Sequence, residues 1–176
     1  MVDSSRARVE EVWSPPVQGT FKINVDASFN FVTSEAGYGF LIRNFGGFII
    51  DGFAAKFRRF SPLVAEGIGL QAAIKFAANR HLGSCLVEID SLQIKSLLSS
   101  LPDLIPWEVA AIIQNQKRLL SCLVNVSISF VPRSANECAS WIACAVRNGT
   151  LLPGWISNPP AQLVKLLAKD MLNVSG

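Results

Sequence analysis

The sequence predicts a mixed α/β domain with a five-stranded sheet whose first three strands are antiparallel. Segments of alternating polarity at 21–28, 36–43 and 48–57 are separated only by short turns, as in consecutive antiparallel strands. Two further apolar segments, 85–89 and 124–130, alternate with long stretches of helical periodicity, which is the order of parallel crossovers. We therefore expect 21–28 and 85–89 to be parallel neighbours at the centre of the sheet.

The first predicted strand is half buried and ends on a carboxylate. Its apolar and polar residues alternate, with Phe21, Ile23 and Val25 on one side and Lys22, Asn24 and Asp26 on the other. Ala27 and Ser28 follow, and their small side chains leave room for a ligand to approach the backbone. In the second strand, Gly37 and Gly39 mark turn or close-approach positions.

Serine and proline signals place the helices. Ser61 and Pro62 are typical of a helix start, which predicts a helix from there through Arg80. The same reasoning predicts helices at 91–100, from 106 or 107 onward, at 136–147 and at 159–172. Trp107 and Trp141 are expected in the core.

The composition is that of one globular domain. The 176 residues are 50% hydrophobic with a mean hydropathy of +0.35, which permits a large core. The net charge of +3 permits a polyanionic partner without requiring one. The four cysteines form no CxxC pair and His81 is the only histidine, so zinc-site spacing is absent. No signal sequence or bilayer-length apolar run occurs, and we expect a soluble intracellular protein of the nucleus or cytoplasm.

The domain organisation follows from local composition. Residues 1–12 are charged and polar and predict a flexible lead-in. Residues 13–150 hold all the predicted strands and are expected to form the domain. Residues 151–176 are expected to be an extension whose short helix packs on that domain.

Three acids stand where a cation site is expected. Asp26 and Asp90 end the two neighbouring parallel strands, and Glu66 lies early in the helix between them. Each alone has a simpler explanation: Asp26 as a turn former, Asp90 as a helix cap, and Glu66 as a favourable charge in a first turn. Together the acids would repel one another, unless a divalent cation offsets the repulsion.

Several motifs in order resemble the ribonuclease H-like family, in its plant type, which includes reverse-transcriptase-like domains of non-LTR retroelements. The resemblance spans about residues 13 to 172. The motifs are Asn24-Val25-Asp26-Ala27-Ser28, Gly37-Tyr38-Gly39 with Ile42-Arg43-Asn44, Ala65-Glu66, Val87-Glu88-Ile89-Asp90-Ser91, and Val131-Pro132-Arg133 followed by Asn136. The borders also match, with Trp13 and two prolines before the first strand and Trp155, two prolines and Asp170 near the end.

The resemblance implies Mg²⁺-dependent endonucleolytic hydrolysis of the RNA strand of RNA–DNA hybrids by a monomer. Two Mg²⁺ ions, which Mn²⁺ can replace, would be held by Asp26, Glu66 and Asp90, with Asp26 bridging both. Small polar groups would read the 2′-hydroxyls and arginines would contact phosphates. The residues expected in these contacts are Ser28, Arg43, Ser91, Arg133 and Asn136.

One departure from the family pattern concerns the fourth acid. The family places it four residues after the asparagine, where this chain has Ser140. Ser140 would be a weak neutral ligand or a hydrogen-bond partner, and Glu137 is a candidate substitute. The leading interpretation is an active hydrolase. The alternatives are a catalytically weakened or inactive nucleic-acid-binding module, which Ser140 favours, and a scaffold with no nucleic-acid role.

Overall fold

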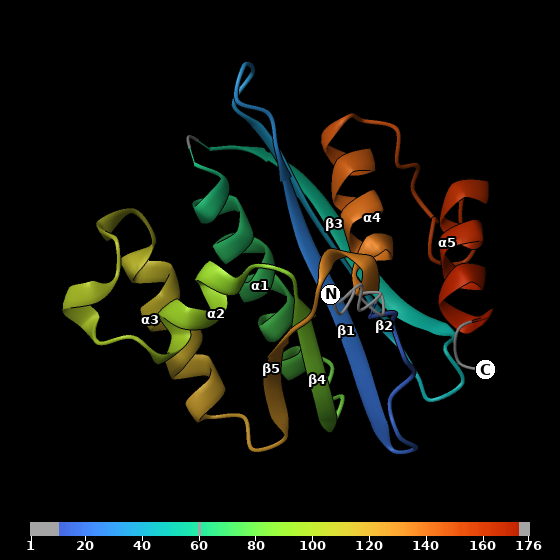
Figure 1. Cartoon of the computed structure of the whole chain (residues 1–176), viewed down its shortest axis with the longest axis horizontal. Coiled ribbons are helices and arrows are strands. Elements are labelled where there is room, and N and C mark those ends of the chain that lie inside the picture. Colours follow the sequence, from blue (N-terminus) through green and yellow to red (C-terminus); the bar gives the residue numbers. More distant parts are fainter. Residues whose placement is uncertain (1–10, 60, 173–176) are drawn as a thin grey trace, which may run out of the picture.

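The computed structural model describes residues 11–59 and 61–172 and contains one five-stranded sheet in the order β3-β2-β1-β4-β5 (Figure 1). The strands are β1 (Thr20–Phe29), β2 (Glu35–Arg43), β3 (Ile49–Arg58), β4 (Ser84–Ile89) and β5 (Val126–Phe130). β1, β2 and β3 pair antiparallel, while β4 is parallel to β1 and β5 is parallel to β4. The predicted sheet is therefore confirmed, with β1 and β4 as central parallel neighbours.

Within residues 11–59 and 61–172, five α-helices cover the two faces of the sheet (Figure 1). They are α1 (Pro62–Asn79), α2 (Leu92–Ser99), α3 (Trp107–Ser121), α4 (Glu137–Arg147) and α5 (Ala161–Leu172). Short 3₁₀ turns at Pro102–Leu104 and Arg133–Ala135 precede α3 and α4. Of the predicted lead-in, residues 1–10 lie outside the described residues. None of the helices in the described part of the chain combines the length and apolarity needed to cross a bilayer.

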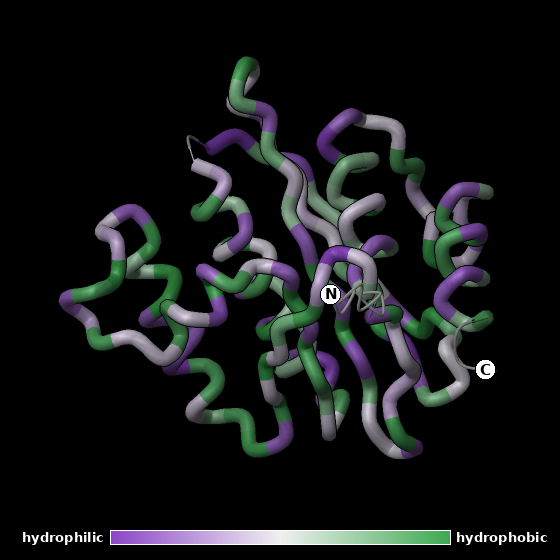
Figure 2. Tube along the Cα trace, in the orientation of Figure 1, coloured by the Kyte–Doolittle hydropathy of each residue, from purple (hydrophilic) through white to green (hydrophobic). Residues whose placement is uncertain are grey.

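The alternation of β1 divides the core into two parts. Ile23 and Val25 lie in a large apolar cluster with α1 and α3 on one face of the sheet. On the other face, α4 and α5 enclose a second cluster that includes Leu41, Ile142 and Leu163. Figure 2 shows the same alternation of hydrophobic and hydrophilic residues along the strands. The polar residues of β1 therefore lie on the side of the sheet that α4 covers.

Two glycines of β2 let α4 lie directly on the sheet. A Cβ at Gly39 would be 2.3 Å from Cγ2 of Ile142, and one at Gly37 would be 2.7 Å from the carbonyl oxygen of Ala143. Both separations are shorter than any tolerated carbon contact, so only glycine permits this approach. The predicted close-approach role of these glycines is confirmed.

The start of α1 and of α3 shows how local signals act. Ser61 caps α1, because its hydroxyl accepts a hydrogen bond from the Val64 amide, as the sequence predicts. The prediction that Trp107 is a core residue is wrong, since its side chain is 91% exposed. Trp107 is the first residue of α3, whose inward face carries Val109 and Ile113 instead. Trp141 is half-buried and packs against the cluster beneath α4 and α5.

Candidate active site

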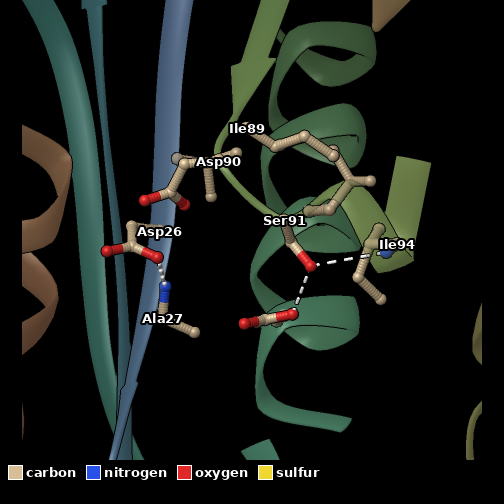
Figure 3. A pocket seen from close by; sticks show the side chains of 9 residues that line it. Asp26, Ala27, Ile89, Asp90, Ser91 and Ile94 are labelled. Atoms are coloured by element: carbon tan, nitrogen blue, oxygen red, sulfur yellow. Dashed lines mark hydrogen bonds between the residues drawn. The ribbon is translucent and has the colours of Figure 1, made fainter. Parts of the chain in front are cut away.

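Asp26 lies in the second half of β1, next to the point where the neighbouring strand β4 ends and Asp90 follows it. Its Oδ1 accepts a hydrogen bond of 2.8 Å from the amide of the next residue, Ala27 (Figure 3). The same picture shows the carboxylates of Asp26 and Asp90 close to each other at the front of the sheet. The parallel pairing of β1 with β4 brings these two side chains together, as the sequence predicts.

Glu66 reaches the same place from the second turn of α1. Its carboxylate accepts a short hydrogen bond from the hydroxyl of Ser91. Ser91 also caps α2, because its Oγ accepts from the amide of Ile94 at 3.3 Å (Figure 3). Ser91 therefore holds Glu66 and the start of α2 in one arrangement.

Asp26, Glu66 and Asp90 line one open cleft together with Ser140. The lining residues are Asp26, Ala27, Ser28, Phe29, Phe31, Pro62, Ala65, Glu66, Asp90, Arg133 and Ser140. Arg133 is at the rim, with Nε 3.8 Å from Oδ2 of Asp90 and a side chain that is 94% exposed. At that distance and exposure the pair adds little to stability, so Arg133 is available to a ligand.

The electrostatics of the cleft favour a positive ligand. Burial, followed by the nearby charge of Asp90, raises the pKa of Asp26 to about 7, although hydrogen bonds from Ala27 and Ser140 lower it in part. Burial also raises the pKa of Glu66, which the hydrogen bond from Ser91 and the charge of Arg133 offset in part. A carboxylate with a raised pKa is one whose charge lacks compensation, and a cation would supply it.

The donor atoms suit Mg²⁺. All the candidate ligands are oxygens, three from carboxylates and one from the Ser140 hydroxyl, and hard divalent cations prefer oxygen. Among the residues that the structure describes, no three acidic, histidine or cysteine side chains are drawn together tightly enough to enclose an ion. A bound ion would have to compete with Ser91 for the carboxylate of Glu66. The residue types therefore fit Mg²⁺, in an arrangement that is open.

Arg43 is not a substrate contact, and that prediction is wrong. Its side chain is 1% exposed on the far side of the sheet from α1. Nη1 contacts Oδ2 of Asp170 at 2.6 Å, Nη2 donates to Oδ1 of Asn24 at 2.8 Å, and the guanidinium lies 3.5 Å from the ring centre of Trp13. All of its partners are protein groups, so Arg43 stabilises the fold.

The prediction that Asn136 contacts the substrate is also wrong, because this side chain is buried as well. Its side chain is 1% exposed, accepts a hydrogen bond from Asn24 and donates one of 3.0 Å to the carbonyl oxygen of Val25. Asn136 thus ties the start of α4 to β1 one residue before Asp26. It positions the site without lining the cleft.

Asn24 and Glu88 are functional support residues that sequence reasoning did not assign. Asn24 donates to Glu88 at 2.8 Å, and Glu88 forms an ion pair of 2.7 Å with Lys22. The signal was present in the sequence as polar residues on the second side of β1. The sequence did not identify their partners, which for Asn24 are Arg43 of β2, Glu88 of β4 and Asn136 just before α4.

Glu137 does not replace the missing fourth acid. Its carboxylate pairs with Lys169 of α5 at 2.8 Å, and Glu137 is not among the residues that line the cleft. Ser140, one helical turn later, does line it. The fourth position is therefore occupied by a neutral hydroxyl.

Comparisons with known proteins agree with this architecture. The family model described as reverse transcriptase-like matches residues 24–146, which include all three acids and Ser140. A search of curated proteins returned no match.

Solved structures share the fold at low sequence identity. The N-terminal RNase H domain of a Mycobacterium tuberculosis protein, fused to maltose binding protein, matches with a TM-score of 0.66 and 20% identity over 74% of this chain and 95% of that chain. RNase H1 of Halobacterium salinarum matches with a TM-score of 0.66 and 20% identity, over 74% of this chain and 98% of that chain. LC11-RNase H1, isolated from compost and solved with an RNA/DNA hybrid, matches with a TM-score of 0.63 and 17% identity, over 75% of this chain and 99% of that chain. The family model covers more than half of the chain, which therefore belongs to the reverse transcriptase-like family and has an RNase H-like α/β fold.

Proposed function

We propose that this protein is a Mg²⁺-dependent endonuclease that hydrolyses the RNA strand of RNA–DNA hybrids. The observation that carries the proposal is the meeting of Asp26, Glu66 and Asp90 in one cleft from three separate elements. Burial, together with the nearby charges of Asp90 and Glu66, raises the pKa of Asp26, so the three carboxylates are costly to keep together without a cation. A structural match to an RNase H1 that was solved with an RNA/DNA hybrid supports the same substrate class.

Asp26, Glu66 and Asp90 would hold the metal. Bound Mg²⁺ supplies an activated water and neutralises the charge that develops on the phosphodiester. Within the chain, the Ser140 hydroxyl hydrogen-bonds to Asp26, and Ser91 orients Glu66. Both serines are therefore positioned to set which carboxylate oxygens face the cleft.

Of the five substrate contacts that the sequence predicts, three remain in this proposal. Ser28 and Arg133 line the cleft, and Ser91 lies at its inner side. The exposed guanidinium of Arg133 suits a phosphate, and the small polar Ser28 suits a 2′-hydroxyl. We further propose that the protein acts as a monomer and belongs to the plant type of the family.

A second candidate function is a nucleic-acid-binding module with weakened or absent catalysis. The observation that favours it is Ser140, since a neutral hydroxyl stands where the family pattern has a fourth carboxylate. Loss of one negative ligand weakens the attraction for a divalent cation, and hydrolysis would fall before hybrid binding does.

One experiment separates the two functions. Cleavage of an end-labelled RNA–DNA hybrid is measured in Mg²⁺ and in Mn²⁺ for the wild type, Asp26→Asn and Ser140→Asp, with Ser121→Asp as the control because it adds the same charge to an exposed serine at the end of α3. Cleavage by the wild type above Asp26→Asn supports the endonuclease. Cleavage only by Ser140→Asp supports the weakened module. If neither the wild type nor Ser140→Asp cuts or binds the hybrid, both proposals fail.

A further inference from the structure

An uncovered aromatic surface lies on β3, away from the carboxylate cleft. β3 is an edge strand, and Asp51, Phe53, Ala55 and Phe57 alternate along the side that faces α1. α1 packs over β1 and β2, whereas α4 covers the opposite side of β3. Phe53 is consequently 47% exposed, although it lies within a strand.

Three rings form this surface, which we call the aromatic face: Tyr38 of β2 with Phe53 and Phe57 of β3. The ring centres of Tyr38 and Phe53 are 6.3 Å apart, and those of Tyr38 and Phe57 are 5.8 Å apart. Beside Phe53 on the same side of the sheet, the fully buried Phe40 of β2 has its ring centre 6.3 Å from that of Phe53. Because the rings support one another on a paired sheet, the aromatic face is preorganised for a flat ligand.

Cationic side chains border the aromatic face. The Arg59 guanidinium is 5.8 Å from the centre of the Phe57 ring, and its Nη1 donates to the carbonyl oxygen of Arg58. Within the described residues, Arg59 has no carboxylate within ion-pair distance. Arg80 lies 5.1 Å from the Phe76 ring centre and 3.3 Å from Asp51. The border therefore carries positive charge that protein groups only partly neutralise.

We propose that the aromatic face binds single-stranded RNA or DNA by stacking unpaired bases on Phe53 and Phe57, while Arg59 contacts the phosphates. Aromatic rings combined with arginine suit this ligand, because every base has a π-face and every linkage a negative charge. A duplex does not suit it, since its bases are stacked inward. The net charge of +3 agrees with a polyanionic ligand. None of the three rings lines the carboxylate cleft, so this binding is separate from hybrid hydrolysis.

The test measures the binding of fluorescent oligouridylate and oligothymidylate to the full chain by anisotropy, in EDTA at low salt. Phe53→Ala is expected to weaken binding about tenfold, the usual effect of removing one stacking ring. Phe53→Trp, which keeps an aromatic ring at this position, should bind the oligonucleotides as the wild type does. Arg59→Ala should weaken binding. It should also reduce the slope of log K against log salt concentration by about the amount that one phosphate contact contributes. Phe48→Ala is the matched control, because Phe48 is a 72% exposed phenylalanine just before β3 that is not part of the aromatic face.

The outcomes separate this inference from the proposed function. A tenfold loss with either oligonucleotide supports the aromatic face, even if the protein fails to cleave hybrids, because no metal is present. Absence of single-strand binding, or equal binding by wild type and Phe53→Ala, overturns the inference and leaves hybrid cleavage untouched. A wild-type dimer that Phe53→Ala converts to a monomer in light scattering also overturns it, since the aromatic face would then join two copies of the chain.

Discussion

Arg43 and Asp170 form a buried ion pair at 2.6 Å that joins β2 to the last helix, α5. The two side chains are 1% and 8% exposed, so water screens neither charge. Asp170 lies beyond residues 24–146, which the family model matches, and so does Trp13, whose ring stacks on Arg43. Segments on both sides of the family core thus enclose one arginine of that core.

Replacing Asp170 by Ala should lower the free energy of unfolding by about 3–5 kcal/mol, because it leaves the Arg43 charge buried without a partner. Urea denaturation measures the change. The control is Lys169→Ala, next to it on α5, whose ion pair with Glu137 is partly exposed and should contribute under about 1 kcal/mol. Equal effects of the two substitutions would contradict a dominant role for the buried pair.

Deleting residues 151–176 should be at least as destabilising, since it removes Asp170 and the buried Leu163 together. This deletion also tests whether the predicted boundary at residue 150 marks an independent domain. A truncated chain that unfolds at the same urea concentration as the full chain would show that it does. We expect instead that the shorter chain unfolds earlier or fails to fold.

Gly39→Ala should destabilise the protein and move α4 away from β2. The added Cβ would fall 2.3 Å from Cγ2 of Ile142, so the helix must shift. We expect a loss of about 1–3 kcal/mol, typical of overpacking. Gly149→Ala is not a suitable control because Gly149 has a positive φ of 73°. Ser121→Ala, at the exposed end of α3, is suitable and should change stability little.

Metal-free protein should lose stability as the pH rises from about 4 to 7. Asp26 has a folded-state pKa of about 7 against 3.8 in the unfolded chain, so the folded state binds more protons between these values. Asp26→Asn keeps an acceptor for the Ala27 amide but removes the charge. The variant should gain roughly 2 kcal/mol relative to wild type between pH 5 and pH 8, measured by denaturation in EDTA. Asp103→Asn, which makes the same change at an exposed aspartate outside the cleft, is the control.

Cys122 should react faster than Cys85 and Cys138 in the native protein. It is exposed, whereas burial raises the pKa of Cys85 to about 11 and that of Cys138 to about 12. Reaction requires the thiolate, which the two buried residues scarcely form at pH 8. Mass spectrometry after brief maleimide treatment should find label on Cys122 and little on Cys85 or Cys138, and Cys122→Ala should remove the Cys122 label. Fast labelling of Cys85 would contradict the buried position of β4.

The strands and helices followed from sequence because their signals are local. Alternating polarity set the boundaries of β1, β2 and β3 to within about two residues, and Ser61 with Pro62 set the start of α1. Trp107 shows the limit, since its hydrophobicity alone does not say that the first turn of α3 points outward. The three acids were identifiable because Asp26 and Asp90 stand toward the ends of predicted strands and Glu66 lies early in the predicted helix between them.

The role of each polar residue required the tertiary structure. Arg43 and Arg133 are the same residue type with equally suggestive neighbours in sequence, yet one is 1% exposed and the other lies at the rim of the cleft. Their difference arises because Asp170, 127 positions away, and Trp13 enclose Arg43. By itself the sequence determined the sheet, the helices and the carboxylates that end its central strands. Only the tertiary structure decided which charges serve the fold and which face a ligand, because long-range packing sets desolvation.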